Sequence, residues 1–415
     1  MSSVAAYAAI LAGCILIYWC LPRARQDVFL WVASAAFIAT IDWKTAAWLM
    51  GFSVLTFVAT QTLGGRYKSL TLLSCVSVGG YLAYNKYLPP LFEYLKAPGH
   101  KAAAAVVVPL GASYFTFKLI HYVIESTRGH IPRHTFSEFL SYMFFLPMFP
   151  AGPIERFDEF LKNRTRTFSS DLLYRGGTRI LYGLIKKYVI LDLILARHEE
   201  HARLVEGIPL LMPSYSTVKL LEHLGTLNPV FVWQYVINGY VGIYMDFSAY
   251  TDIAVGLGLF LGVKLQENFD YPFLATNIGD FWKRYHMSLS NWAQRYVYFP
   301  VLGATRNAQL ALFATMLMIG LWHAGNLNYF AWGLYQASML SLHLVWTRYR
   351  RRRVGREEDD SPFAKFVEGK PFNFLGWALT FMGVCGSFAF SSTQQQGAWA
   401  GVRILAALVG IHLNG

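Results

Sequence analysis

Two histidines stand where an imidazole could act on a substrate. His323 lies near the end of the apolar run 308–325, in the sequence Gly-Leu-Trp-His-Ala-Gly-Asn, and His286 precedes it in a segment dense in aromatic and cationic residues. An ionisable side chain inside an apolar segment is costly, so it is a functional candidate by default. A neutral imidazole can take a proton from a hydroxyl near pH 7, as a general base does. For an isolated buried histidine the favoured interpretation is a structural role, in which the ring is hydrogen-bonded to a neighbouring carbonyl. The motifs that surround these two histidines favour a catalytic base instead.

The segment around His286 gathers groups that suit a phosphorylated thioester. Cationic side chains could bind its phosphates, and aromatic side chains could line a passage for an acyl or pantetheine chain. The alternative is an interfacial aromatic belt with cations reaching to water, which leaves His286 and the two serines after it unexplained. The predicted lining of the donor passage is Trp282, Lys283, Arg284, Tyr285, Ser288, Ser290, Trp292 and Asn326.

A set of polar residues interrupts another apolar stretch. The set consists of Asp246, Ser248, Tyr250 and Asp252, within the run 231–262. Its members pair at a spacing of four residues, so each pair can share a helix face. Two interpretations stay open: these residues order His286 and Arg284, or they form a structural polar network.

Lys118, His121 and Glu125 fall on one face of the stretch 104–124. An internal charge network is the favoured interpretation, and a proton path is the alternative. His198 and His201 are three residues apart, whereas the zinc-protease motif needs four on a helix, so they predict a solvated loop. We expect no metal site and no tightly bound cofactor.

Composition places these residues in a membrane. Of 415 residues, 55% are apolar and 14% are charged, whereas soluble proteins carry about 25% charged residues. The formal charge of +12 comes from short basic clusters between apolar runs, the pattern of cytoplasmic loops beside anionic lipid. We therefore expect membrane lipid and no nucleic acid as a partner, and a single membrane-embedded domain over residues 1–415.

The apolar runs predict an all-α polytopic bundle of roughly ten to twelve membrane elements, because a crossing helix needs about 20 apolar residues. One run, 137–150, contains two prolines and is followed by Ala-Gly-Pro, which favours a re-entrant or broken helix. The candidate runs are 4–21, 28–41, 45–63, 69–88, 104–124, 137–150, 180–196, 231–262, 308–325, 329–347, 373–391 and 397–412.

Basic residues predict the orientation of the bundle. Lys and Arg clusters follow several apolar runs, and the segments 155–187 and 264–306 are basic as well. Under the positive-inside rule these segments are cytoplasmic and the N-terminus is outside. Because Arg306 and the arginines after residue 347 then both lie inside, His323 is expected in the outer half of the bundle.

Several segments, taken in order, resemble the membrane-bound O-acyltransferase family, in the bacterial branch of alginate O-acetyltransferases and teichoic-acid D-alanyl transferases. His323 matches the family's catalytic histidine, and His286 matches a second histidine of this branch. The resemblance covers a catalytic core of roughly 105–335, flanked by 1–104 and 336–415. The matching segments are 109–117, 151–157, 246–252, 267–269, 281–292 and 320–323.

The sequence departs from the family's pattern at three positions. Lys283 and Tyr285 stand where the commoner motif has Arg and Trp. Lysine keeps the charge but cannot bind a phosphate through two parallel hydrogen bonds. Gln336 stands where many relatives have His, which leaves the role of that position open.

The resemblance implies a central tunnel in the bacterial cytoplasmic membrane and a group transfer across it. The donor, acetyl-CoA or the phosphopantetheine thioester of an acyl carrier protein, would be a co-substrate at the cytoplasmic face. The acceptor would be a hydroxyl of an exported glycan, or of an accessory protein that relays the acyl group, at the outer face. His323 would deprotonate that hydroxyl, while His286, with Trp282 and the nearby Ser288 and Ser290, would position the thioester and stabilise the oxyanion.

Other readings of the same residues stay open. Within this class, the chain could transfer D-alanine from a carrier-protein thioester to teichoic acid. A transporter or flippase with an intramembrane proton relay would use Lys118, His121, Asp246 and Asp252, but it leaves the ordered motifs unexplained. A non-catalytic scaffold for an export complex is disfavoured because both histidines are present.

Overall fold

The computed structural model describes residues 2–62, 76–77, 79–80, 83–84, 86–87, 111–149, 151–195, 217–353 and 361–413. Within these ranges the elements are helical, and the only β-pairing consists of two isolated bridges. The predicted all-α class is therefore confirmed. The chain divides into two compact units: unit 1 is residues 1–184 with 249–267, and unit 2 is residues 185–248 with 268–415. The expected span 69–88 lies mostly outside the described residues, and the loop 198–201 lies entirely outside them.

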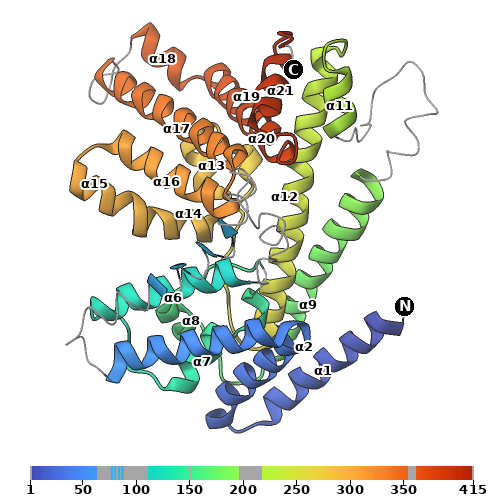
Figure 1. Ribbon diagram of the computed structural model, residues 1–415, viewed down its shortest axis with the longest axis vertical. Coiled ribbons are helices and arrows are strands. Elements are labelled where there is room, and N and C mark those ends of the chain that lie inside the picture. Colours follow the sequence, from blue (N-terminus) through green and yellow to red (C-terminus); the bar gives the residue numbers. More distant parts are fainter. Residues whose placement is uncertain are drawn as a thin grey trace, which may run out of the picture. The chain divides into compact units, whose positions relative to one another are not determined.

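Unit 1 is built from helices (Figure 1), and those at its start, 2–20 and 23–57, cover most of the predicted runs 4–21, 28–41 and 45–63. Its elements are α1 (Ser2–Cys20), α2 (Arg23–Phe57), η1 (Val58–Thr62), α6 (Ala112–Thr127), α7 (Phe136–Met143), η2 (Leu146–Met148), α8 (Phe157–Lys162), α9 (Ser170–Leu184) and the part of α12 (Pro229–Phe260) from Ala249 onward. The two predicted runs 28–41 and 45–63 form one long helix that kinks at Asp42, whose backbone is non-helical (φ −152°, ψ 101°).

The run 137–150 is a broken helix, as predicted. A capping box begins α7: the Thr135 hydroxyl accepts from the Glu138 backbone N–H, and the Glu138 carboxylate accepts from the Thr135 N–H. The helix ends at Met143, and a short 3-10 turn with Pro147 follows. Proline lacks the N–H that would continue the helix, so the break follows directly from the sequence.

A buried ion pair joins separate elements of unit 1. Asp27 of α2 binds Arg164, and both side chains are almost fully buried. Arg166 binds the second oxygen of Asp27 at 2.9 Å and Glu138 of α7 at 3.2 Å. Removing one partner of a buried pair leaves an uncompensated charge, which is strongly destabilising. The sequence alone did not single out these residues.

Unit 2 holds both candidate catalytic histidines. It contains long helices, and between them a run of short elements that sequence periodicity did not predict. The elements are η3 (Ile185–Leu195), α11 (Thr217–His223), α12 up to Ser248, η4 (Pro272–Leu274), α13 (Ile278–Arg284), α14 (Met287–Ala293), η5 (Gln294–Tyr298), α15 (Phe299–Thr305), α16 (Ala308–His323), α17 (Leu327–Arg353), α18 (Pro362–Glu368), α19 (Lys370–Gly386), α20 (Phe388–Ser392) and α21 (Ala398–Ala407).

Helices α16 and α17 form a hairpin whose backbones touch (Figure 1). A Cβ atom on Gly320 would lie 2.3 Å from the carbonyl oxygen of Tyr329, and one on Gly333 would lie 2.8 Å from that of Met316. Only glycine permits so close an approach. The contact places His323, the last residue of α16, beside the first turns of α17.

The described helices expose large apolar side chains. Leu16 is 68% exposed, Trp43 67%, Leu342 70% and Leu379 63%. Exposed apolar surface of this extent marks contact with a membrane or a partner. Two helices, Arg23–Gln61 and Lys370–Ser392, are long and apolar enough to cross a membrane, and shorter apolar helices occur at Ala9–Cys20, Ala308–His323 and Ala398–Ala407. The count of ten to twelve membrane elements stays a prediction.

The glycine contact between α16 and α17 can be tested by adding one methyl group. Glycine to alanine in an open helix normally stabilises by about 0.5–1 kcal/mol. Gly333→Ala should instead lower the free energy of unfolding by about 1–3 kcal/mol, because the added carbon overpacks the contact. Thermal unfolding in detergent would show a lower Tm. Gly303→Ala in α15, which has no neighbour within 4 Å, is the control, and equal Tm values for both variants would refute the contact.

Candidate active site

His286 occupies an unusual backbone conformation between α13 and α14. Its φ of 46° and ψ of 52° lie in the left-handed region, which non-glycine residues seldom adopt. Such a conformation costs about 1–3 kcal/mol and persists only where the surroundings enforce it. This conformation separates α13, which ends at Arg284, from α14, which begins at Met287.

Residues 268–270 enforce this conformation, because their backbone pairs with the backbone around His286. The Met287 N–H donates to the Asn268 carbonyl at 2.9 Å, and the Asp270 N–H donates to the Arg284 carbonyl at 3.0 Å. The Asn268 side chain, fully buried, accepts from the Ser288 hydroxyl at 2.6 Å and from the Ser288 N–H at 3.3 Å. Asn268 is therefore a positioning residue, which sequence reasoning placed in a motif but not in the site.

The His286 imidazole is buried and has spare hydrogen-bonding capacity. Its side chain is 4% exposed, and neither ring nitrogen has a hydrogen-bond partner among the described residues. Phe247 contacts the ring edge-on at 4.6 Å between centroids, and Trp322 lies 6.2 Å away. An unpaired charge in such surroundings is very costly, so the ring is neutral, with one donor and one acceptor available to a ligand.

His323 lies next to the same indole, but on the accessible side. Its ring centroid is 4.8 Å from that of Trp322, so both histidines share this neighbour. Tyr329 stacks on the His323 ring at 5.3 Å, and Trp332 contacts it at 5.5 Å. Unlike His286, His323 is exposed. The pair therefore combines one imidazole reachable from outside with one enclosed by aromatic rings.

Two more buried groups near this aromatic cluster have unused polar atoms. Trp282 packs against Trp332 at 6.0 Å, and its indole N–H has no partner among the described residues. Gln336, one turn beyond Trp332 on α17, is fully buried, and both its amide atoms are unsatisfied within the same ranges. Buried polar groups nearly always have partners, so each exception calls for a water, an ion or a ligand.

Other residues predicted for the donor passage serve the scaffold. Ser288 binds Asn268, the Ser290 hydroxyl donates to the Tyr285 carbonyl at 3.2 Å, and the Asn326 side chain accepts from the Tyr329 N–H at 3.0 Å. Their place along a passage stays a prediction.

The cationic and aromatic members of the same segment are held differently. Arg284 binds Asp280 at 2.9 Å and Asp270 at 3.6 Å. Lys283 is exposed, and Trp292 packs on Tyr296 at 5.1 Å. Of the cations, Lys283 is thus the more accessible to a phosphate.

The polar set of the run 231–262 binds basic residues of neighbouring helices. In unit 2, Lys187 binds Asp246 at 2.7 Å and Lys186 donates to the Ser248 hydroxyl at 2.7 Å. In unit 1, Arg179 binds both Asp252, at 2.7 Å, and Glu267, at 2.6 Å. These contacts support the interpretation as a structural polar network.

Tyr250 completes this set in unit 1, where its hydroxyl is hydrogen-bonded to the backbone of Ala151.

The set on α6 also binds backbone and charged groups of unit 1. Buried Lys118 donates to the carbonyls of Tyr142 and Met143, at 3.0 and 2.7 Å. His121 accepts the Phe157 N–H at 3.0 Å. Lys118 thereby ties α7 to α6, and His121 ties α8 to α6. Glu125 binds Arg128 and His130 in the turn after α6, and these contacts fit the favoured charge network.

Glu155 is a buried carboxyl outside every candidate span, between η2 and α8. It is 4% exposed, and its oxygens accept from the Gln266 N–H at 2.9 Å and the Arg156 N–H at 3.3 Å. Burial raises the pKa of Glu155 to about 7, and these two hydrogen bonds oppose the rise only in part.

Within the described ranges, no group of three or more His, Cys, Asp or Glu residues has a geometry that could hold a metal ion.

Comparison of the amino-acid sequence with known proteins finds related chains. A sequence model of the membrane-bound O-acyltransferase family matches residues 29–382. A probable alginate O-acetylase of Pseudomonas aeruginosa is 30% identical over 348 residues, 80% of this chain and 59% of the relative. A peptidoglycan O-acetyltransferase of Helicobacter pylori is 27% identical over 94% of this chain and 75% of its own length. A teichoic acid D-alanyltransferase of Bacillus subtilis is 27% identical over 68% of this chain and 75% of its own length.

The chain thus spans somewhat more than half the length of the alginate relative that it matches.

The positioning role of Asn268 predicts a stability loss on truncation. Asn268→Ala leaves the buried Ser288 hydroxyl and N–H without their acceptor, so the free energy of unfolding should fall by about 1–3 kcal/mol. Asn291→Ala, the same change at an exposed position of α14, should cost little. Thermal unfolding of both variants in detergent is the measurement. If the two variants unfold at the same temperature, the Asn268 contacts do not hold this turn.

Glu155 predicts that stability falls as pH rises. The unfolded carboxyl loses its proton above its ordinary pKa of 4.5, whereas the folded one keeps it up to about 7. The folded state therefore binds more protons in this window, and the free energy of unfolding should drop by about 2 kcal/mol between pH 5 and pH 7. Glu155→Gln should remove this slope. Unfolding measured across that range checks the prediction, with Glu222→Gln, at an exposed position of α11, as the control that keeps the slope.

Proposed function

Because this chain belongs to the membrane-bound O-acyltransferase family, we propose that it moves an acetyl group from a cytoplasmic thioester to a hydroxyl of an exported cell-surface polysaccharide, or of a protein that relays the group. The observation that carries the proposal is the pairing of His323, accessible at the end of α16, with His286, buried and without a hydrogen-bond partner among the described residues. Both imidazoles lie beside one indole, that of Trp322.

The proposed reaction assigns different tasks to the two histidines. His323 accepts the proton of the acceptor hydroxyl while the oxygen attacks the thioester carbonyl carbon. A C–O bond forms, the carbonyl electrons move onto its oxygen, and the tetrahedral intermediate collapses as the C–S bond breaks. The thiolate then takes the proton from the His323 imidazolium, which restores the base.

Donors for the transient oxyanion come from groups that have spare hydrogen-bonding capacity. The neutral His286 ring can present one N–H, and the Trp282 indole presents another. Because both are buried among aromatic rings, a hydrogen bond to a developing negative charge would be stronger there than in water. The left-handed backbone at His286 keeps this donor in place before the substrate arrives.

The orientation predicted from the basic loops determines on which side of the membrane we place the donor and the acceptor. We propose a protein of the bacterial cytoplasmic membrane, with the N-terminus outside and the donor, acetyl-CoA or an acyl carrier protein, at the basic inner face. The acceptor glycan approaches His323 from outside. Transfer at a point between the two faces would spare the cell from moving either charged carrier across the bilayer.

D-alanyl transfer to teichoic acid is the second candidate. The Bacillus subtilis relative, a teichoic acid D-alanyltransferase, favours it, whereas the acetylases of alginate and peptidoglycan favour acetyl transfer to a glycan. The two reactions need the same base and oxyanion donors and differ in the acyl group and the acceptor, so the site chemistry leaves both available. Labelled acetyl and D-alanyl thioesters offered in parallel would separate them.

Replacement of the base should abolish transfer without unfolding the protein. His323→Ala should lower the rate of glycan acylation by about 10²–10⁴-fold, the usual contribution of a general base. The side chain is exposed, so the membrane level and the Tm should stay close to those of the wild type. The measurement is the incorporation of labelled acetyl groups into glycan by the purified protein.

His223→Ala supplies the matched control. This histidine is exposed on α11, where its ring binds the Lys219 carbonyl. The His223→Ala variant should transfer acetyl groups at the wild-type rate. Persistent acylation by His323→Ala would show that another group is the base.

A further inference from the structure

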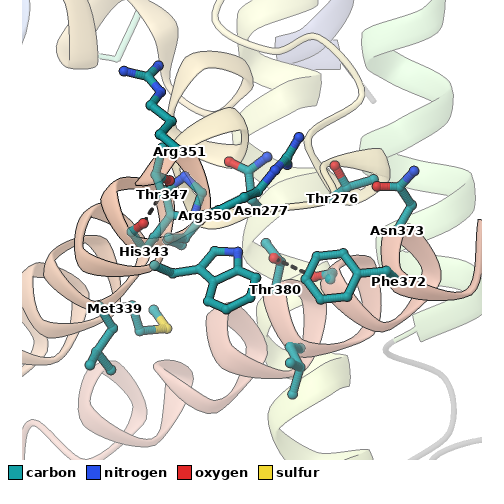
Figure 2. Close-up of a pocket in the computed structure, with 15 residues that line it drawn as sticks. Thr276, Asn277, Met339, His343, Thr347, Arg350, Arg351, Phe372, Asn373 and Thr380 are labelled. Carbon is teal, nitrogen blue, oxygen red and sulfur yellow. Dashed lines mark hydrogen bonds between the residues drawn. The ribbon is translucent and has the colours of Figure 1, made fainter. Parts of the chain in front are cut away.

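A cavity of about 740 Å³ lies in unit 2 between α17 and α19, apart from the two histidines (Figure 2). One face of each helix supplies most of its wall, and the segment 276–278 supplies the rest. The indole N–H of Trp377 donates to the Phe273 carbonyl at 2.7 Å, which ties this segment to α19. The lining residues are Thr276, Asn277, Ile278, Met339, Leu342, His343, Trp346, Thr347, Arg350, Arg351, Phe372, Asn373, Gly376, Leu379 and Thr380.

Exposed apolar side chains line one side of this cavity. Leu342 is 70% exposed and Leu379 is 63% exposed, yet both line the cavity. Leu379 belongs to Lys370–Ser392, a helix long and apolar enough to cross a membrane. An apolar chain already in the bilayer could therefore enter sideways between these leucines, without passing through water.

The other end of the cavity is cationic. Arg350 and Arg351 line it, two further arginines follow them in the last turn of α17, and none of the lining residues is acidic. In Figure 2 the Arg351 side chain extends away from the other labelled residues, where it can reach a group at the mouth. Asn277 and Asn373 add side-chain amides to the lining.

We infer that this cavity binds an anionic phospholipid of the surrounding membrane. The phosphate would be bound by Arg350 and Arg351, and one acyl chain would lie along Met339, Leu342 and Leu379. Basic pockets between membrane helices on the cytoplasmic side bind acidic headgroups for the same reason: charge complementarity at one end and apolar contact at the other. A lateral opening favours a lipid over a water-soluble phosphate compound, which would have to cross hydrocarbon to reach these leucines.

Native mass spectrometry of the whole protein tests this inference. The protein would be reconstituted in mixed phosphatidylglycerol and phosphatidylcholine, and the phosphatidylglycerol retained after gentle detergent release would be counted. Wild type should retain one molecule. The double variant R350A/R351A should retain it at least about tenfold less, as expected when charge-assisted contacts are lost. R352A/R353A, the same charge change on residues outside the lining, should retain it as wild type does.

The apolar part of the cavity can be tested separately. Leu342→Trp would fill the lateral opening and should also release the lipid, whereas Val345→Trp, on an exposed position of α17 outside the lining, should not. Circular dichroism of all four variants would show that the helices persist. Equal retention by R350A/R351A and its control would overturn the assignment.

Competition with coenzyme A shows whether the cavity binds the phosphate of a lipid or that of the thioester donor. Added at millimolar concentration to the reconstituted protein, it should leave the bound phosphatidylglycerol in place. If coenzyme A displaces the lipid from the wild type, the cavity belongs to the thioester donor, and the lipid assignment is wrong. Acyl transfer by R350A/R351A, measured in parallel, should persist, so loss of lipid and loss of catalysis remain distinguishable.

Discussion

The candidate site depends on one backbone constraint, the left-handed conformation of His286 (φ 46°, ψ 52°). Its cost, about 1–3 kcal/mol, is offset by the pairing of residues 268–270 with residues 284–287 and by the buried Asn268 side chain. Because α13 ends and α14 begins at this turn, the same constraint fixes Trp282 and Ser288 on either side. The close hairpin of α16 and α17 then brings His323 to the same aromatic cluster.

A second constraint is that buried polar atoms need hydrogen-bond partners. In unit 1 several of them bind the scaffold: Lys118 binds two carbonyls, His121 accepts a backbone N–H, and Asp27 binds two arginines. Other buried side-chain atoms of that unit have no hydrogen-bond partner among the described residues. In unit 2, His286, Trp282 and Gln336 keep unsatisfied atoms among the described residues. Unpaired buried groups cost about 1–3 kcal/mol each, so a fold optimised for stability alone would not gather three of them. Because these three side chains lie around one aromatic cluster, the catalytic proposal rests on unit 2, and Gln336 is a candidate for substrate contact.

Much of the architecture could be predicted from the sequence. The long apolar runs 4–21, 231–262 and 308–325 became α1, α12 and α16 within two residues at each end, and the prolines near 147 marked the broken helix. The short elements α13, α14 and α15 were missed because seven residues give too little periodicity. The roles of Asn268 and Trp332 depend on contacts between segments far apart in the chain, which spacing along one helix cannot reveal. The hydrogen bonds that hold Ser288 and Asn326 to the scaffold likewise could not be read from the sequence.

The central claim is that a thioester on one side of the membrane reacts with a hydroxyl on the other at the His286–His323 pair. Sealed proteoliposomes test it directly, with labelled acetyl thioester in contact with the cytoplasmic face only and the acceptor glycan at the opposite face only. The account predicts that label reaches the glycan while the donor stays in its own compartment, and that His323→Ala vesicles show none of this transfer. Transfer that occurs only when donor and acceptor share a compartment would contradict the account.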